Sequence, residues 1–175
     1  MKVALVGWAD PLFAGMIEGD GHTLCLSGRD QMNACDIAFI CVPQPEVDDV
    51  MRWLRVPLIV IRTTMPEFCR DHEWTTFANS PHIHVVYQPI CDTWLGLVVA
   101  AGTKAQEVCD FWRPILGEDA TYVATSWRQA ERIRATVEQY TDGLLTPLER
   151  KLLELMGDGV RTVLANHQGS VSLAG

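Results

Sequence analysis

The stretch Lys2-Val-Ala-Leu-Val-Gly7 is a continuous apolar run that ends at a glycine. A run of this kind, without alternating polar side chains, is typical of a strand buried on both faces of a parallel sheet. Asp10-Pro11 follows and predicts a helix start, with the aspartate as N-cap and the proline at the first helical position. Glycines at 19 and 21 end the predicted helix. A strand, a glycine turn and a helix predict the first unit of an α/β fold.

Segments typical of strands and helices alternate through most of the remaining chain. Strands are predicted at 23–27, 36–42, 57–61, 84–87, 97–101 and 121–124, and 28–34 is interpreted as a short polar connection. The residues of 46–54 repeat with the period of a helix, which predicts a helix there. Three more helices are predicted after capping boxes that begin at Thr103, Ser126 and Thr146. This order predicts an α/β fold: a Rossmann-like, mostly parallel sheet flanked by helices over residues 1–142, with an appended C-terminal helix and tail in 143–175.

The predicted C-terminal helix carries an apolar stripe with steps of three and four residues. The stripe consists of Leu148, Leu152, Leu155, Met156, Val160, Val163 and Leu164. It could pack on the chain's own sheet or against another subunit, and both alternatives stay open. The second alternative predicts a homo-oligomer or a larger protein assembly formed through this helix.

Composition excludes several classes of function. The formal net charge is −8 and no basic residues cluster, so we expect no nucleic-acid partner. No apolar run approaches the roughly 20 residues of a membrane span, so we expect no membrane partner. The six cysteines form no CxxC pair and no metal-ligand spacing. We therefore expect reduced thiols in a cytoplasmic protein, or in a particle assembled in the cytoplasm, and no metal site.

Six short motifs follow one another over residues 1–138. They are Val6-Gly-Trp-Ala-Asp-Pro-Leu12, Ile40-Cys-Val-Pro-Gln-Pro45, Thr63-Thr-Met-Pro66, Gln88-Pro-Ile90, Val98-Val-Ala-Ala-Gly102 and Ala130-Glu-Arg-Ile-Arg134. Their order resembles the GxGYVG, VPTP, STVP, NPEF, Gly-Gly and AExxKxxxN motifs of the nucleotide-binding domain of UDP-glucose and GDP-mannose dehydrogenases. The resemblance implies a degenerate, truncated Rossmann domain. One or two helices of the family are missing between the second and third predicted strands.

The glycine-rich loop of that family is altered in this chain. Gly7 is kept, but Ala9 replaces the second glycine and Leu12 the third. Leu12 should either push the helix away from the strand or point elsewhere, because the third glycine allows close packing. Asp10 lies where a helix N-terminus would offer N–H groups to a phosphate. At an effective dielectric near 20, two unit charges about 4 Å apart repel by about 4 kcal/mol. We therefore expect no cofactor.

If the site does hold NAD(P), five residues are candidates for contacting it. They are Gly7, Ala9, Asp30, Pro43 and Thr64. Asp30 could bind the ribose hydroxyls, while Arg29 could favour a 2′-phosphate. A solvated turn at these two positions is an equally open alternative.

The family's catalytic groups are replaced where the resemblance aligns them. Ile90 stands at the glutamate of NPEF, Arg134 at the lysine, and Glu138 at the asparagine. Only Thr64 matches the family, at the threonine of the STVP motif. The resemblance places the nucleophilic cysteine in a later domain that this chain lacks. We therefore expect no catalytic residues of the family's type, because acid–base catalysis needs its groups positioned together.

Two functions remain as hypotheses. The first is a catalytically inactive Rossmann-like domain reused as a structural or assembly protein, for example as a virus-encoded particle component. The alternative is an NAD(P)-binding, oxidoreductase-like protein that acts on a nucleotide sugar.

Overall fold

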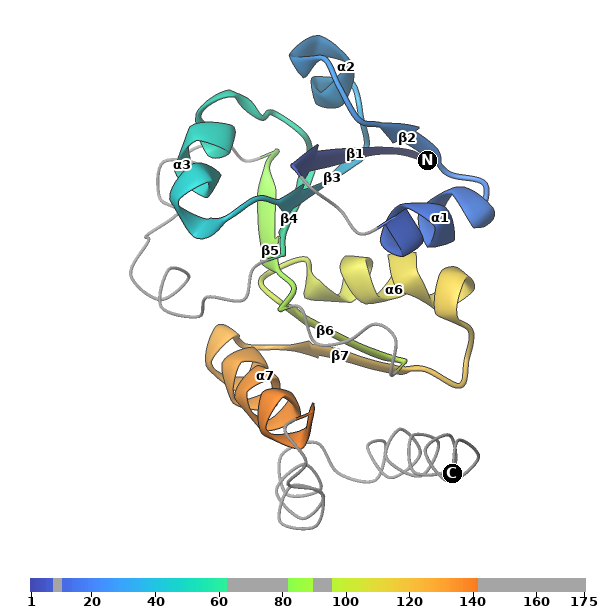
Figure 1. Ribbon diagram of the computed structural model, residues 1–175, viewed down its shortest axis with the longest axis vertical. Helices are drawn as coiled ribbons and strands as arrows, with labels where there is room; N and C mark the ends of the chain where they lie inside the picture. Colours follow the sequence, from blue (N-terminus) through green and yellow to red (C-terminus); the bar gives the residue numbers. More distant parts are fainter. Residues whose placement is uncertain (8–10, 63–81, 90–95, 142–175) are drawn as a thin grey trace.

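Seven strands form one sheet in the computed structural model, which describes residues 1–7, 11–62, 82–89 and 96–141 (Figure 1). The strands are β1 (Lys2–Gly7), β2 (Thr23–Cys25), β3 (Ile37–Cys41), β4 (Leu58–Ile61), β5 (His84–Tyr87), β6 (Leu97–Ala101) and β7 (Thr121–Thr125). The helices are α1 (Pro11–Gly19), α2 (Arg29–Asn33), α3 (Gln44–Trp53), α6 (Ala105–Leu116) and α7 (Trp127–Thr141).

The strand order is β2-β1-β3-β4-β5-β6-β7. Neighbouring strands from β2 to β5 are parallel, β6 runs antiparallel to β5, and β7 is parallel to β6. This confirms the predicted Rossmann-like, mostly parallel sheet flanked by helices. From β1 the chain adds β2 on one side and then crosses to β3 on the other. Ligands of open α/β sheets bind at such a switch point, outside the carboxyl ends of the strands.

Helices cover both faces of the sheet (Figure 1). On one face, α1 and α6 pack over a core that contains Phe13, Phe39, Phe111 and Trp112. On the other face, residues of α2, α3 and α7 join a second core. Both cores take alternate residues of the same strands, which explains why the strands are apolar without alternation. Within the described ranges, no helix combines the length and apolar character that crossing a membrane requires.

Two local predictions need correction. The segment 28–34 was expected to be a polar connection, but it contains the short helix α2, whose Met32 is only 7% exposed. Thr103 was expected to cap the next helix, yet α6 begins at Ala105 and its N-cap residue Lys104 makes no side-chain cap bond. The Ser126 cap does form, because the Gln129 N–H lies 3.3 Å from the Ser126 hydroxyl oxygen. The predicted C-terminal helix in 143–175 lies outside the described residues, so its role in assembly stays a prediction.

Asn33 joins α2 to the segment after α3. Its Nδ2 donates to the Trp53 carbonyl at 3.2 Å, and its Oδ1 accepts from the Arg55 N–H at 2.7 Å. We expect Asn33→Ala to lower the free energy of unfolding by about 1–3 kcal/mol, because two hydrogen bonds are lost. Urea unfolding followed by far-UV circular dichroism measures the change.

The control is Asp49→Ala, which breaks an ion pair with Arg52 whose two side chains are 73% and 78% exposed. Such a surface pair contributes about 1 kcal/mol or less. Equal losses in the two variants would show that Asn33 does not hold these segments together.

Candidate functional site

One row of residues closes the carboxyl end of four neighbouring parallel strands. Gly7 pairs with Cys41, the Arg62 N–H donates to the Ile40 carbonyl at 3.0 Å, and the Gln88 N–H donates to the Ile61 carbonyl at 2.9 Å. The hydrogen bonding between β3, β4 and β5 therefore continues for one residue past the end of β4, at Arg62, and past the end of β5, at Gln88. We call this set the edge row: Gly7, Cys41, Arg62 and Gln88.

The edge row differs in polarity from the row beneath it on the same face. Two residues earlier on each strand lie Leu5, Phe39, Val60 and Val86, which are 2% exposed or less and face α1 and α6. At the edge, Arg62 is 8% exposed and Gln88 is 1% exposed. A buried cation and a buried amide thus replace hydrophobic side chains where the strands end.

Gly7 allows β1 and the end of β3 to approach closely. Its φ is +96°, and an added Cβ would lie 2.4 Å from Val42 Cγ1 and 2.6 Å from the Cys41 carbonyl oxygen. Only glycine fits this backbone and this space. Pro43, another predicted site residue, follows Val42 directly and is exposed at the start of α3. The structure therefore brings the surroundings of Gly7 and Pro43 together at the switch point.

Arg62 lies against the first turn of α1. Its Cζ is 3.9 Å from the centroid of the Phe13 ring, a cation–π contact. Its charge also reaches Cys41: burial raises the pKa of the Cys41 thiol, and the positive charge of Arg62 opposes that rise. With its pKa above the usual value, Cys41 is a protonated thiol at neutral pH and a poor nucleophile.

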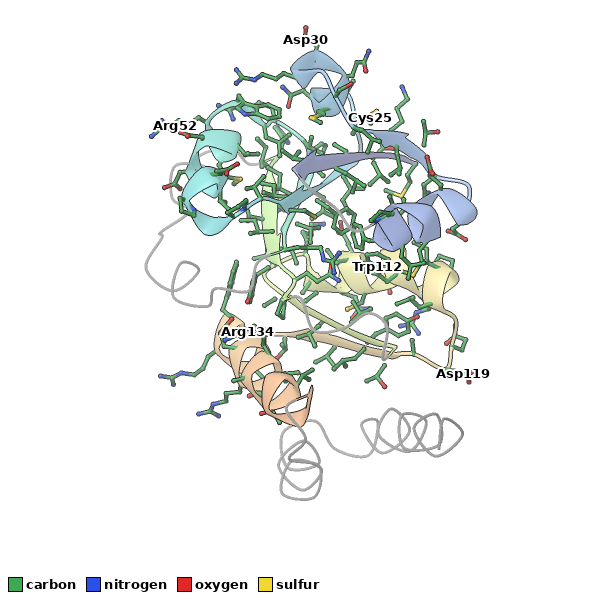
Figure 2. The ribbon with its side chains drawn as sticks, viewed as in Figure 1. Cys25, Asp30, Arg52, Trp112, Asp119 and Arg134 are labelled. Atoms are coloured by element: carbon green, nitrogen blue, oxygen red, sulfur yellow. The ribbon has the colours of Figure 1, made fainter. Side chains whose placement is uncertain are left out.

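Gln88 is held from the helix side of the sheet. Its Oε1 accepts a hydrogen bond from Trp112 Nε1 at 3.2 Å, and both side chains are buried. Figure 2 shows Trp112 on α6, beneath α1. The hydrogen bond fixes the Gln88 amide at the end of β5, beside Arg62.

The sequence motifs do not mark Arg62 as a site residue, and they include Gln88 only as the first residue of Gln88-Pro-Ile90. A signal was available: each polar residue directly follows a buried run of β-branched or aromatic residues, where a parallel strand ends.

The other predicted residues lie apart from the edge row or outside the described ranges. Asp30 is exposed at the outer tip of α2 (Figure 2). Arg29 stacks on Trp53, with its Cζ 5.1 Å from the ring centroid. Ala9 and Thr64 are not among the described residues.

Leu12 is 44% exposed, so it does not separate α1 from the sheet. Of the two expectations for Leu12, the structure supports the one in which the side chain points elsewhere. Phe13 instead fills the space between α1 and the strands, and it is 3% exposed. The substitution of the third glycine is therefore compatible with a normally packed α1.

Arg134, which stands at the family's lysine position, is buried on α7 (Figure 2). Its Nε lies 3.5 Å from Glu131 Oε2, and the two side chains are 11% and 18% exposed. An arginine in such a pair keeps its proton and is not a general base. Ile90 and the side chain of Glu138 lie outside what the structure describes.

The described part of the chain has no second candidate for a catalytic site based on a reactive cysteine or a metal ion. Cys25, Cys35, Cys41 and Cys109 are free thiols, and burial raises the pKa of Cys35 and Cys109 to about 11. No group of three histidine, cysteine, aspartate or glutamate side chains suited to a metal comes together within these ranges. The edge row is therefore the strongest candidate site among the described residues.

The sheet order, the glycine turn and the helices on both faces define a Rossmann-type domain of the kind found in NAD(P)-binding oxidoreductases. An imine reductase from Myxococcus stipitatus, solved in complex with NADP⁺, matches with a TM-score of 0.56 and 16% identity, covering 99% of this chain and 73% of that chain. GDP-mannose dehydrogenase from Pseudomonas aeruginosa, solved as a ternary complex, matches with a TM-score of 0.58 and 12% identity. That match covers 81% of this chain and 50% of the dehydrogenase. Pyrroline carboxylate reductase from Plasmodium falciparum, solved with NADP bound, matches with a TM-score of 0.53 and 12% identity, covering 99% of this chain and 78% of that chain.

A scan against protein-family models finds no match, and neither does a search of curated proteins. At these identities the structural matches establish the fold, and function has to be argued from the site.

Proposed function

We propose that this chain is an NAD(P)-binding, oxidoreductase-like protein that holds the dinucleotide along the carboxyl edge of β1 and β3. The observation that carries this proposal is the edge row, with Gly7 closing the switch point and Arg62 beside the first turn of α1. Two of the similar structures contain NADP⁺ or NADP, which supports the choice of ligand.

The residues of the edge fit such a ligand in three respects. Gly7 leaves the end of β1 without a side chain, as the first fingerprint glycine does. Arg62 supplies positive charge for phosphate oxygens. Arg29 and Asp30 follow β2, where 2′-phosphate and ribose contacts are made in this fold, so they would set the choice between NADP and NAD. The chemistry that a bound nicotinamide ring supplies is hydride transfer.

A nucleotide sugar is the substrate class we propose. The order of motifs along 1–138 resembles the UDP-glucose and GDP-mannose dehydrogenase family, and GDP-mannose dehydrogenase is among the similar structures. Arg134, which pairs with Glu131, stands at the family's lysine position. We therefore propose binding of the nucleotide sugar without the family's complete set of acid–base groups.

Asp10 opposes the dinucleotide, because it immediately precedes α1 and carries a negative charge. The expected repulsion of a phosphate is at most about 4 kcal/mol at 4 Å, and solvent reduces it at the surface. Asp10→Asn keeps a residue type that is favoured at helix N-caps and removes the charge. We expect this variant to tighten the Kd for NADH and NADPH by about 10- to 100-fold.

Isothermal titration calorimetry with NAD⁺, NADH, NADP⁺ and NADPH tests the proposal, with and without UDP-glucose and GDP-mannose. Asp119→Asn is the matched control, because it removes one exposed carboxylate at a distant turn (Figure 2). We expect submillimolar binding by the natural chain and no change with Asp119→Asn. A silent titration for both the natural chain and Asp10→Asn would contradict the proposed function.

The hypothesis of an inactive assembly protein depends on residues 143–175, which lie outside the described residues. It stays a prediction, as does a homo-oligomer formed through that segment. Measurement of the mass in solution beside the titration distinguishes the two functions: a defined oligomer that binds no dinucleotide would favour assembly.

A further inference from the structure

Two of the free thiols, Cys25 and Cys35, lie beside each other at the two ends of the segment that contains α2. Cys25 is the last residue of β2, and Cys35 follows the end of α2 by two residues. A side-chain hydrogen bond links the two thiols. We propose that this pair is a modification site, at which a small disulfide oxidant forms a reversible Cys25–Cys35 disulfide that ties α2 to the edge of the sheet. The inference goes beyond dinucleotide binding and does not depend on it.

The topology brings the two thiols together on one face of the sheet. β1 lies between β2 and β3, and α2 packs against β1. Cys25 pairs with Ala4 of β1, and both cysteines pack in the core that also takes residues of α2, α3 and α7. The Cys35 Sγ donates to the Gln31 carbonyl at 3.4 Å, so this thiol points back along α2 rather than on toward β3. A disulfide requires two cysteines that lie close with their side chains directed at each other, and this arrangement favours both.

The surroundings make Cys25 the thiol that meets the oxidant. Cys25 is half-buried on β2, an edge strand of the sheet, and the next residue, Leu26, is 64% exposed. Cys35 is 5% exposed, and burial together with its hydrogen bond to Cys25 raises its pKa to about 11. Because the thiolate is the attacking form, Cys25 reacts first and Cys35 second. Cys35 then reacts within the same molecule, which offsets its small thiolate fraction.

The reaction consists of two thiol–disulfide exchanges. The Cys25 thiolate attacks one sulfur of the small disulfide, which forms a mixed disulfide and releases one small thiolate. The Cys35 thiolate then attacks the Cys25 sulfur, which forms the Cys25–Cys35 bond and releases the second small thiolate. The two cysteines lose two protons to solvent and two electrons to the oxidant, which is reduced from one disulfide to two thiols.

The fold favours this pairing over others among the four described thiols. Cys41 and Cys109 pack in the opposite core, beneath α1 and α6. The sheet therefore separates them from Cys25 and Cys35. The new bond would close a loop over 25–35 that contains all of α2, and such a bond stabilises the folded state by restricting the unfolded chain.

Trypsin reports the pairing, because it cleaves after Arg29, between the two cysteines. The reduced, full-length chain is incubated with oxidised glutathione, the remaining thiols are alkylated, and the tryptic peptides are identified by mass spectrometry. We expect peptides 3–29 and 30–52 to be joined, and to join at least about 10-fold faster in the folded chain than in urea. The melting temperature of the oxidised chain should exceed that of the reduced chain by about 5–10 °C.

Three alanine variants assign the bond. Cys25→Ala and Cys35→Ala should each abolish the linked peptides and the rise in melting temperature on oxidation. Cys35→Ala is the sharper of the two, because peptide 30–52 also contains Cys41. Cys109→Ala is the matched control: it removes a buried thiol of the opposite core and should keep both effects.

Linked peptides that persist in Cys35→Ala would assign the bond to Cys41 and overturn the inference. No linkage in the folded natural chain would overturn it as well, and so would a linkage that forms no faster than in urea. If an alanine variant does not fold, the natural chain decides, because fragmentation of its linked peptides shows whether Cys35 or Cys41 carries the bond.

Discussion

Gly7→Ala is expected to lower the free energy of unfolding by about 2–6 kcal/mol. A non-glycine residue at φ +96° costs about 1–3 kcal/mol in backbone strain. The new Cβ would also overlap Val42 Cγ1 and the Cys41 carbonyl, and overpacking of this kind costs about 1–3 kcal/mol. Since a domain of this size is typically stable by about 5–15 kcal/mol, the variant loses a large share of its stability.

Urea unfolding followed by far-UV circular dichroism measures this loss. Gly15→Ala is the control: Gly15 lies within α1, and an added Cβ there would meet nothing within 4 Å. Alanine in a helix interior should raise stability by up to about 1 kcal/mol. The two alanine substitutions should therefore have opposite signs, and a neutral Gly7→Ala would show that β1 and β3 do not approach as closely as described.

Trp112→Ala is expected to cost about 3–5 kcal/mol, because it removes a large side chain that is fully buried. The Trp112 ring lies 5.2 Å from Phe13, 5.8 Å from Phe39 and 5.4 Å from Phe111, measured between centroids. These contacts join α1, α6 and β3, so the cavity would open at the centre of one core. Denaturation followed by circular dichroism gives the value without depending on tryptophan fluorescence.

Trp112→Phe separates packing from hydrogen bonding at the same position. It keeps an aromatic ring but removes the Nε1 donor, which leaves the buried Gln88 Oε1 without that bond. Loss of such a bond costs about 1–3 kcal/mol. If Trp112→Ala proved no more damaging than Trp112→Phe, the aromatic cluster would not carry the stability assigned to it.

The fold could be predicted from the sequence because its strands are buried on both faces. Runs such as Val3–Val6 and Ile59–Ile61 supply alternate side chains to two cores, so they are apolar throughout and stand out in a short window. The antiparallel β6 could not be predicted this way. Its direction depends on pairing between Tyr87 and Ala101, which no local pattern records.

The candidate site was predicted only in part. Gly7 carries its own signal, because a glycine that ends an apolar run marks a tight turn. Arg62 and Gln88 carry a weaker signal, because they become neighbours only when strands far apart in the sequence pair in the sheet. Leu12 shows the reverse error: its position in a motif suggested a clash, but the helix turns that side chain toward solvent and buries Phe13 instead.

The edge row collects its members from positions as far apart as 7 and 88, one from each of four adjacent strands or strand ends. A fragment of the chain that holds all four members must span at least residues 7–88. Any molecule that recognises the edge row would select the assembled sheet over every partly folded state, by thermodynamic linkage. A ligand present at a hundred times its Kd would add about 2.7 kcal/mol to the stability of the whole sheet. Binding and folding are thermodynamically coupled here, so a bound ligand would raise the melting temperature of the domain.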